Sequence, residues 1–415
     1  MKSLVIFLLS FLSVIASSAQ PISNYQSLDP NNPITFGGTY IEFQGKHIQL
    51  GPNAFFIDGQ LTNEQAAKYK FVYNSINEAA KHLTDGTEDA PMVLYIAPHV
   101  YWIDDPDDPE VRVPKPGEHT PFGLEITCQW LRFYGLSDDP QNVVLAANRG
   151  QTMGAKGNFT MLNITGDGTS AENVTFGNYC NIDLNFPLKP ELNRKKRASA
   201  IVQAQLVFCH GDKLVARNTR FVSRLNLCPF IGGKRTFFDH CHFESTDDAL
   251  ASKGLYLNCD FEFYSSKPFY HTTGTGAILL NCSIKSFVRG EQYMVKAGGQ
   301  LVVVDCQMEA PTATYWGWQD KPALESRNYE CDDLFNGKSY AIDPHHPSAT
   351  VDMTGKSVLD AYRFSYNGKV KYNIYNLLRG DDDWDPASMK QLVLDAEKAN
   401  GKNYTNMPTQ LLLSP

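Results

Sequence analysis

The sequence predicts an all-β fold, a right-handed parallel β-helix or solenoid, from three observations. Short apolar segments recur about every 20 to 25 residues through the middle of the chain, and such a period is typical of stacked solenoids. The segments are rich in β-branched and aromatic residues and are bounded by Gly, Asn and Ser, as short strands are. No 3.6-residue apolar periodicity lies between them. Each unit is therefore a coil of short strands, and neighbouring coils stack as parallel sheets.

The segments share one internal pattern: apolar residues, a polar residue, Cys or Thr, a polar residue and an apolar residue. The cysteines at this position are Cys241, Cys259, Cys282 and Cys306, separated by 18, 23 and 24 residues. We expect them to stack inside the solenoid as small hydrophobic side chains. The Asn, Asp or His before each Cys should form a ladder that bridges coil to coil. The segments with this pattern are residues 215–221, 237–243, 255–261, 278–284 and 302–308.

A solenoid of this kind needs a cap at each end. Residues 64–83 are the best helical stretch near the start of the chain and precede an apolar strand, so they predict an N-terminal capping helix. A second helix should begin at Asp385, a good N-cap that precedes a proline, and end at Gly401. We expect the chain from about Ser339 onward to form a C-terminal wrap, with this short helix, along the solenoid.

The first residues have the pattern of a signal peptide. Lys2 precedes a short apolar run over residues 4–15, and small residues up to Ala19 then form a cleavage site. An uncleaved membrane anchor is the alternative, although the run is short for one. We therefore expect residues 1–19 to be removed, residues 20–415 to form a single β-helix domain, and the protein to be exported, periplasmic or extracellular.

Composition narrows the partners and cofactors. The net charge of −8 comes from mixed acidic and basic residues without a basic stripe, which argues against nucleic acid. Nine cysteines is an odd number, so at least one must be free or must pair between chains. No metal-ligand spacing occurs, and no later segment is apolar enough to span a bilayer. We expect a monomer that needs no metal or cofactor.

Two segments before the repeat resemble the pectin methylesterases. Residues 162–176 (LNITGDGTSAENVTF) and 200–213 (AIVQAQLVFCHGDK) are similar to that family's V-x-G-D-G-x-x-A-x-N-x-T-F-x-N and Q-A-V-A-L-x-x-x-G-D. With the repeat, the resemblance covers roughly residues 71–336. It implies a parallel β-helix enzyme that removes methyl groups from esterified galacturonic acid in pectin, without a cofactor.

The resemblance also implies roles for individual residues. Gln203 falls on the Gln of Q-A-V-A-L, which helps to stabilise the oxyanion, and Asp248 falls on the Asp of V-D-F-I-F-G, the nucleophile. Arg289 falls on the Arg of G-R-P-W, which orients that carboxylate. Asp248 and Arg289 each lie 7 residues after a repeat cysteine and two coils apart, which is roughly 10 Å at the usual strand spacing. A nearby Arg keeps a carboxylate ionised, so we expect Arg289 to lie beside Asp248.

The proton donor of that family is missing from this chain. The Q-D-T-L element falls on residues 225–228, so the acid/base Asp is replaced by Asn226, whose amide cannot carry the proton. Four replacements are open: Asp247, His242, His271 or a water molecule held by Asn226. Either histidine would titrate in the useful range. Asp247 directly precedes the predicted nucleophile and points to the opposite face if the strand is regular.

Trp316 and Trp318 alternate with Gly317, so both rings point to one face if they lie on a strand. On an exported solenoid, two such rings suit a platform on which sugars stack. The alternative is that they pack against the C-terminal wrap. The sequence favours neither interpretation.

Other functions remain open on the same fold. Residues 245–254 (STDDALASKG) resemble the G-D-D-C-I-A-I-K-S-G of polygalacturonases, which cleave glycosidic bonds with carboxylates, although that family's other elements are missing. Loss of the acid/base Asp is also what a non-catalytic, pectin-binding solenoid would show. A third interpretation keeps the esterase, because an altered element at residues 225–228 suits an unusual methyl ester, such as one in a branched pectin.

Overall fold

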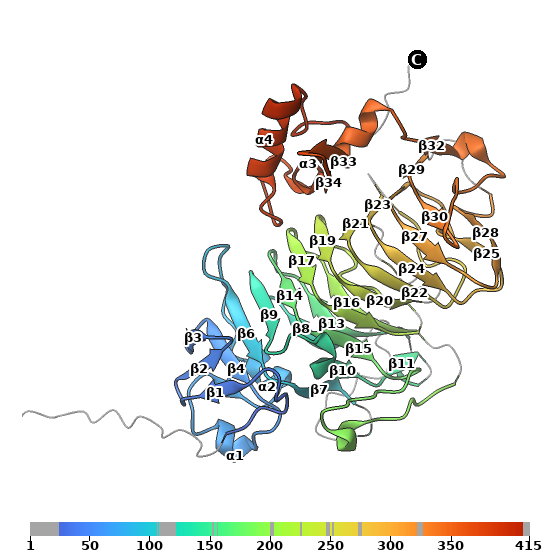
Figure 1. Cartoon of the computed structure of the whole chain (residues 1–415). Coiled ribbons are helices and arrows are strands. Elements are labelled where there is room, and N and C mark those ends of the chain that lie inside the picture. Colours follow the sequence, from blue (N-terminus) through green and yellow to red (C-terminus); the bar gives the residue numbers. More distant parts are fainter. Residues whose placement is uncertain are drawn as a thin grey trace, which may run out of the picture.

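The computed structural model describes residues 25–105, 107, 122–151, 153–155, 157–199, 203–224, 226–245, 250, 253–272, 276–321 and 327–409. The predicted signal peptide, residues 1–19, lies outside the described residues, and so do Asp247 and Asp248. Within the described parts the chain winds into a parallel β-helix, which Figure 1 shows from its blue N-terminal end to its orange C-terminal coils. The predicted fold class is confirmed.

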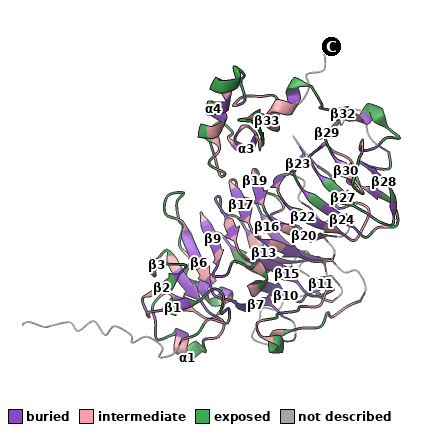
Figure 2. Cartoon of the chain, in the orientation of Figure 1, coloured by how far each residue is buried: buried purple, intermediate pink, exposed green. Residues whose placement is uncertain are grey.

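The solenoid has three sheets, and each central coil visits them in the same order. A strand of a long twelve-stranded sheet comes first, a strand of a ten-stranded sheet follows, and a segment of a shorter third sheet closes the coil. Figure 2 shows that buried residues are concentrated on these strands, whereas exposed residues gather on turns and on the short helices at the two ends. The core therefore lies inside the coils.

The twelve-stranded sheet is parallel throughout its described strands. Its edge strand at the N-terminal end, β5, pairs with β4, and β32 forms the opposite edge. Along the sheet the strands are β32 (Thr350–Asp352), β29 (Asn328–Cys331), β26 (Leu301–Val304), β23 (Ala277–Leu280), β21 (Gly254–Leu257), β19 (Thr236–Asp239), β17 (Leu214–Arg217), β14 (Ser170–Glu172), β9 (Leu131–Gly135), β6 (Met92–Ile96), β4 (Ala54–Ile57) and β5 (Val72–Tyr73).

The ten-stranded sheet is parallel except where β31 folds back on β30. A row of phenylalanines points inward from it: Phe176, Phe221, Phe243 and Phe261 are paired in register, with ring centroids 5.5, 5.2 and 4.9 Å apart. Its strands are β31 (Lys338–Ser339), β30 (Leu334–Phe335), β27 (Gln307–Glu309), β24 (Ser283–Ser286), β22 (Asp260–Phe263), β20 (His242–Ser245), β18 (Arg220–Val222), β15 (Thr175–Asn178), β10 (Val143–Ala147) and β7 (His99–Asp104).

The third sheet is less regular. Three strands open it, single bridges continue it from Phe208 to Ile231 and from Leu250 through Phe269 to Val295, and a strand pair follows. The strands are β8 (Phe122–Ile126), β13 (Phe159–Ile164), β16 (Ala204–Cys209), β25 (Gly290–Tyr293) and β28 (Ala313–Gly317), with the small pair β11 (Gly150–Gln151) and β12 (Gly154–Ala155) beside β13.

The polar residue before each repeat Cys turns the chain from the first sheet to the second. Asn258 and Asn281 have left-handed φ values of 52° and 53°, which Asn adopts more easily than most residues. The side-chain amide of Asn281 donates to that of Asn258 at 2.7 Å, and Asn218 donates to Asn173 at 2.8 Å. The predicted ladder is therefore confirmed for these asparagine pairs only, because His240 is hydrogen-bonded to Asp239 and Asp305 to Arg363 and Tyr372.

The repeat cysteines line the interior, as predicted. Cys241, Cys259, Cys282 and Cys306 are at most 2% exposed and belong to the main hydrophobic core. None of the nine cysteines, all of which lie in the described residues, forms a disulfide, and all are buried. They act as small apolar side chains in the stack and not as cross-links.

The single helix predicted for residues 64–83 is wrong. The segment forms two short helices, α1 (Asn63–Ala66) and α2 (Ile76–Ala80), on either side of strand β5. Ser75 caps the second helix through a hydrogen bond from Glu78 N at 3.1 Å, and Phe71 has a left-handed φ of 66°. Pairing of β5 with β4 outweighs the helical propensity of the sequence. An antiparallel sheet completes this end: β1 (Ile34–Phe36), β2 (Tyr40–Phe43) and β3 (Lys46–Gln49).

The C-terminal segment packs on the outer face of the twelve-stranded sheet. Val302 and Val304 of β26 share a cluster with Ile374, Leu378 and other residues of this segment. The last helix begins later than predicted, at Lys390, but the Asp385 carboxylate still accepts hydrogen bonds from its first N–H groups, and the helix ends at Gly401 as predicted. The elements are β33 (Arg363–Tyr366), β34 (Lys369–Tyr372), α3 (Ile374–Leu378) and α4 (Lys390–Asn400), and the 3-10 turns of the chain are η1 (Pro140–Asn142), η2 (Pro190–Leu192), η3 (Pro347–Ala349) and η4 (Ser357–Ala361).

No helix in the part of the chain that the structure describes is both long and apolar enough to cross a membrane.

Candidate active site

Three of the predicted catalytic residues, Gln203, Asn226 and Arg289, lie where the chain passes from the ten-stranded sheet into the third sheet. Gln203 directly precedes β16, Asn226 follows β18 by four residues, and Arg289 lies between β24 and β25. Asp248 follows β20 by three residues in the sequence, outside the described residues. We call this turn, between the strands of the second sheet and those of the third, the candidate corner.

The register relates the coils that precede Asp248 and Arg289. Ser245, the last residue of β20, pairs with Phe263 of β22, and Phe263 pairs with Ser286, the last residue of β24. Asp248 and Arg289 each follow these serines by three residues, with one coil between them. Two strand spacings are roughly 10 Å, a gap that a long Arg side chain can largely cover. Whether Arg289 contacts Asp248 stays a prediction.

Gln203 and Asn226 belong to neighbouring coils. Leu206 N of β16 donates to the carbonyl of Leu227 at 3.0 Å. Gln203 and Asn226, which precede these two residues, therefore lie at the same edge of the third sheet. Both predicted side chains are half-buried. Asn226 has a left-handed φ of 52°, so it occupies a tight turn that an asparagine accommodates.

His271 lies away from the candidate corner. It is exposed and follows the third-sheet bridge at Phe269 by two residues. Ala297 N donates to the carbonyl of Tyr270 at 2.7 Å, which places His271 opposite Ala297, eight residues beyond Arg289 in the chain. The structure therefore does not bring His271 and Arg289 together.

His242 lies on the outer face of β20 and is held by acidic groups. Its Nδ1 is hydrogen-bonded to Asp260, and its Nε2 is 3.8 Å from Glu244. Burial alone would lower the pKa of His242, but these two carboxylates outweigh it and raise the pKa to about 9. Glu244 also forms ion pairs with Arg224 at 3.2 Å and Arg220 at 3.6 Å. An imidazolium in this network keeps its proton at neutral pH and is a poor donor in a catalytic cycle.

The prediction that Trp316 and Trp318 form a platform for sugars is wrong. Their exposed fractions are 0% and 1%, and both rings belong to the main core. Trp318 Nε1 donates to Thr350 Oγ1 at 2.8 Å, and Trp316 stacks on Tyr340 of the C-terminal segment with ring centroids 6.2 Å apart. The alternative in the sequence, packing against the wrap, is what the structure shows.

Sequence reasoning missed three side chains beside the candidate corner: Arg224, Tyr264 and Phe287. The repeat contained a signal for them, because Tyr264 and Phe287 each lie 5 residues after a repeat cysteine. The rings of Tyr264 and Phe287 are stacked, with centroids 4.7 Å apart and planes at 11°. The guanidinium carbon of Arg224 lies 3.5 Å from the centre of the Tyr264 ring.

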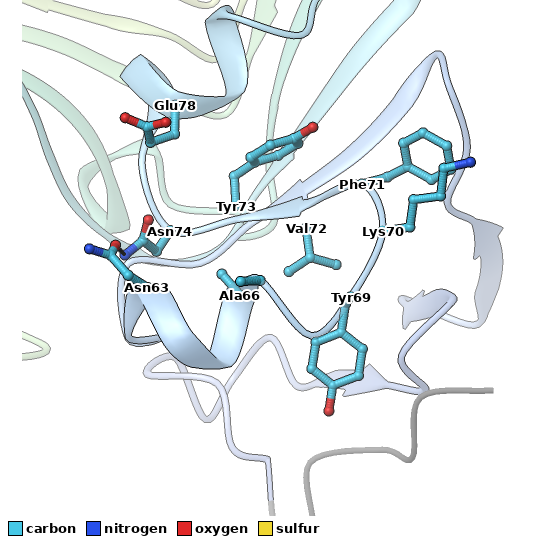
Figure 3. A pocket seen from close by; sticks show the side chains of 10 residues that line it. Asn63, Ala66, Tyr69, Lys70, Phe71, Val72, Tyr73, Asn74 and Glu78 are labelled. Carbon is cyan, nitrogen blue, oxygen red and sulfur yellow. Dashed lines mark hydrogen bonds between the residues drawn. The ribbon is translucent and has the colours of Figure 1, made fainter. Parts of the chain in front are cut away.

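One cavity of the described residues, of about 560 Å³, opens away from the candidate corner, at the N-terminal end between α1, β5 and α2, where Figure 3 shows Asn63 beside Asn74. None of the predicted catalytic side chains lines it. Among the described residues, no three His, Cys, Asp or Glu side chains are grouped so that they could hold a metal ion.

Comparison with known proteins supports the fold, whereas the chemistry has to be argued from the residues of the site. Neither a protein-family model nor a curated protein sequence matches the chain. Solved structures do match it. Pectin methylesterase PemA from Erwinia chrysanthemi is 16% identical, with a TM-score of 0.53 over 81% of this chain and 98% of that one. A pectin methylesterase in complex with a hexasaccharide is 16% identical, with a TM-score of 0.53 over 80% and 98%. A point mutant in complex with another hexasaccharide is 17% identical, with a TM-score of 0.52 over the same shares. The chain therefore has the parallel β-helix fold of these proteins.

Proposed function

We propose that this protein is a carbohydrate esterase that hydrolyses methyl esters of galacturonic acid in pectin. The observation that carries the proposal is the likeness of fold to pectin methylesterases over 98% of their length, two of them in complex with a hexasaccharide. The second support is that Gln203, Asn226 and Arg289 lie at turns between the ten-stranded sheet and the third sheet, and that Asp248 follows β20 by three residues in the sequence.

In the proposed reaction, the Asp248 carboxylate attacks the carbonyl carbon of the methyl ester and forms an acyl-enzyme anhydride as methanol leaves. Arg289 keeps that carboxylate ionised and oriented. The Gln203 amide donates a hydrogen bond to the oxyanion of the tetrahedral intermediate. Water then hydrolyses the anhydride, which releases the free galacturonate and restores Asp248.

The proton for methanol must come from a group other than Asn226. We propose Asp247 or a water molecule held by Asn226, because His271 lies at the far end of its segment and His242 is locked between two carboxylates. The variant Asn226→Asp would restore a titratable carboxyl at this place. We expect it to raise kcat, and Asp247→Asn to lower kcat if that residue is the donor.

The altered Leu225–Asn226 element also motivates a finer proposal on the substrate. We propose a methyl ester in a branched pectin, where the neighbouring sugars differ from those of the smooth backbone. Such an enzyme acts outside the cytoplasm, in keeping with removal of residues 1–19 on export. N-terminal sequencing of protein recovered from the periplasm or medium would test that removal.

The first experiment is methanol release from fractions of highly methylated pectin, linear and branched, by the wild type and by Asp248→Asn. Asp395→Asn, on the exposed face of α4, is the matched control, since it makes the same chemical change far from the candidate corner. We expect methanol from the wild type and the control only. New reducing ends without methanol would identify a glycoside hydrolase instead. Binding without either product would identify a solenoid that only binds pectin.

A further inference from the structure

The outer face of the ten-stranded sheet continues past the ends of its strands into the candidate corner. After β24 begins, burial alternates: Ile284 and Ser286 are buried, whereas Lys285, Phe287 and Arg289 are exposed. Phe287 and Arg289 are therefore both exposed and lie two residues apart, directly after β24.

An aromatic pair lies on this face. Phe287 stacks on Tyr264 of the preceding coil, and its side chain is 44% exposed, which is unusual for a phenylalanine. Arg224 reaches over the far side of Tyr264 and is itself anchored by Glu244 at 3.2 Å. We call these three side chains, Arg224, Tyr264 and Phe287, the aromatic strip. The strip crosses successive coils and so runs parallel to the long axis of the solenoid.

The aromatic strip lies directly beside the predicted catalytic residues. Arg224 precedes Asn226 by two residues, and Phe287 precedes Arg289 by two residues. Two residues of chain span at most roughly 7 Å. A polysaccharide whose ester lies between Asn226 and Arg289 therefore passes over, or close to, the exposed ring of Phe287.

The charges around Phe287 are balanced. Lys285 lies 5.1 Å from the centre of the Phe287 ring, but its partners in register on the neighbouring strands are Glu262 and Glu309. A free carboxylate would meet both signs of charge here, so charge gives it no strong preference. The exposed feature is the flat apolar ring, and the partner that fits it is the apolar C–H face of a pyranose ring.

We infer that the aromatic strip is a sugar-binding subsite, in which a pyranose ring of the pectin chain stacks on Phe287 next to the sugar whose ester is cleaved. The inference rests on the proposed function. It makes Phe287 the substrate-binding residue on which a sugar stacks, a role that the buried Trp316 and Trp318 cannot have. Tyr264 and Arg224 hold that ring in place from behind.

The test separates binding from turnover by using Phe287→Ala and Phe287→Trp. Stacking of a ring on an aromatic side chain contributes about 0.5–1.5 kcal/mol, so we expect Phe287→Ala to raise KM about 2- to 12-fold and leave kcat unchanged. Phe287→Trp should restore KM, because it keeps a flat ring. The control is Val370→Ala, which removes another exposed apolar side chain, on β34.

Binding of a methyl-esterified hexagalacturonate, measured by calorimetry, gives a readout that needs no turnover. We expect its Kd to rise about 2- to 12-fold in Phe287→Ala and to be unchanged in the control. A wild type that binds this ligand through Phe287 but releases no methanol would overturn the esterase and leave the subsite standing. Unchanged KM and Kd in Phe287→Ala, or no binding by the wild type, would overturn the subsite.

Discussion

Glu330 offers a direct test of the electrostatics of the solenoid. It lies on β29, pairs in register with Asp352 of β32, and accepts a hydrogen bond from Ile342 N. Burial is the largest cause that raises its pKa, and the nearby carboxylates of Asp352 and Asp343 add to it, so that the pKa rises from 4.5 to about 7. The folded protein therefore holds this proton more tightly than the unfolded chain does.

The sign of the effect follows from that difference. Below pH 4.5 both states are protonated and Glu330 has no net influence. Between about pH 4.5 and 7 the unfolded chain loses its proton first, so the free energy of unfolding falls as pH rises. Above pH 7 the loss is complete, at about 3 kcal/mol for a pKa difference of about 2.5. The variant Glu330→Gln, which is neutral at every pH, should escape this loss.

The assay is thermal unfolding of the wild type and Glu330→Gln at pH 5 and pH 8. We expect the variant to be more stable by about 3 kcal/mol at pH 8 and by less than about 1 kcal/mol at pH 5. At an unfolding entropy of about 0.8 kcal/mol/K for a chain of this size, the difference at pH 8 corresponds to about 4 °C. The control is Glu309→Gln, which makes the same chemical change at an exposed carboxylate on β27. The reasoning would be refuted by equal shifts of Glu330→Gln at the two pH values.

Substitutions at three further positions test the fold. Because the Trp318 ring fills the core, Trp318→Ala should lower the free energy of unfolding, measured with urea, by about 3–5 kcal/mol. The Kd for pectin, measured by calorimetry, should be unchanged. Asn281→Ala should cost about 1–2 kcal/mol in urea unfolding, and Asn281→Gly less, because a left-handed φ of 53° strains alanine. Arg235 bridges the solenoid to the C-terminal wrap through Asp212 and Asp382, both at 2.6 Å. Arg235→Ala should therefore make trypsin release the C-terminal segment faster, and an unchanged rate would contradict that role.

Features that depend on the repeat could be predicted from the sequence. The cysteine stack and the amide ladder follow from a period that fixes which residues of successive coils meet. The end of the last helix followed from a local signal, since Gly401 adopts the left-handed conformation that stops a helix. Such features need no knowledge of distant contacts.

Features that depend on which side of a strand faces the core could not be predicted from the sequence. The spacing of Trp316 and Trp318 shows that they share a face but leaves open whether that face is inside or outside. His271 was misplaced for a different reason: coil lengths of 18, 23 and 24 residues vary mainly in the third side, where the repeat gives no register. Residues 64–83 do not form one helix because β5 pairs with β4. The local sequence of residues 64–83 does not reveal this contact.

The cysteines affect how this chain folds. Since none of the nine forms a disulfide in the structure, the coils can close without an oxidant or a disulfide isomerase, and a reductant should leave the folded protein unchanged. Burial raises the pKa of Cys128, Cys180 and Cys331 to about 11, so these thiols resist alkylation while the coils are closed. Each thiol becomes reactive when its coil opens. The order in which the stacked cysteines are alkylated therefore reports the order in which the coils of the solenoid open.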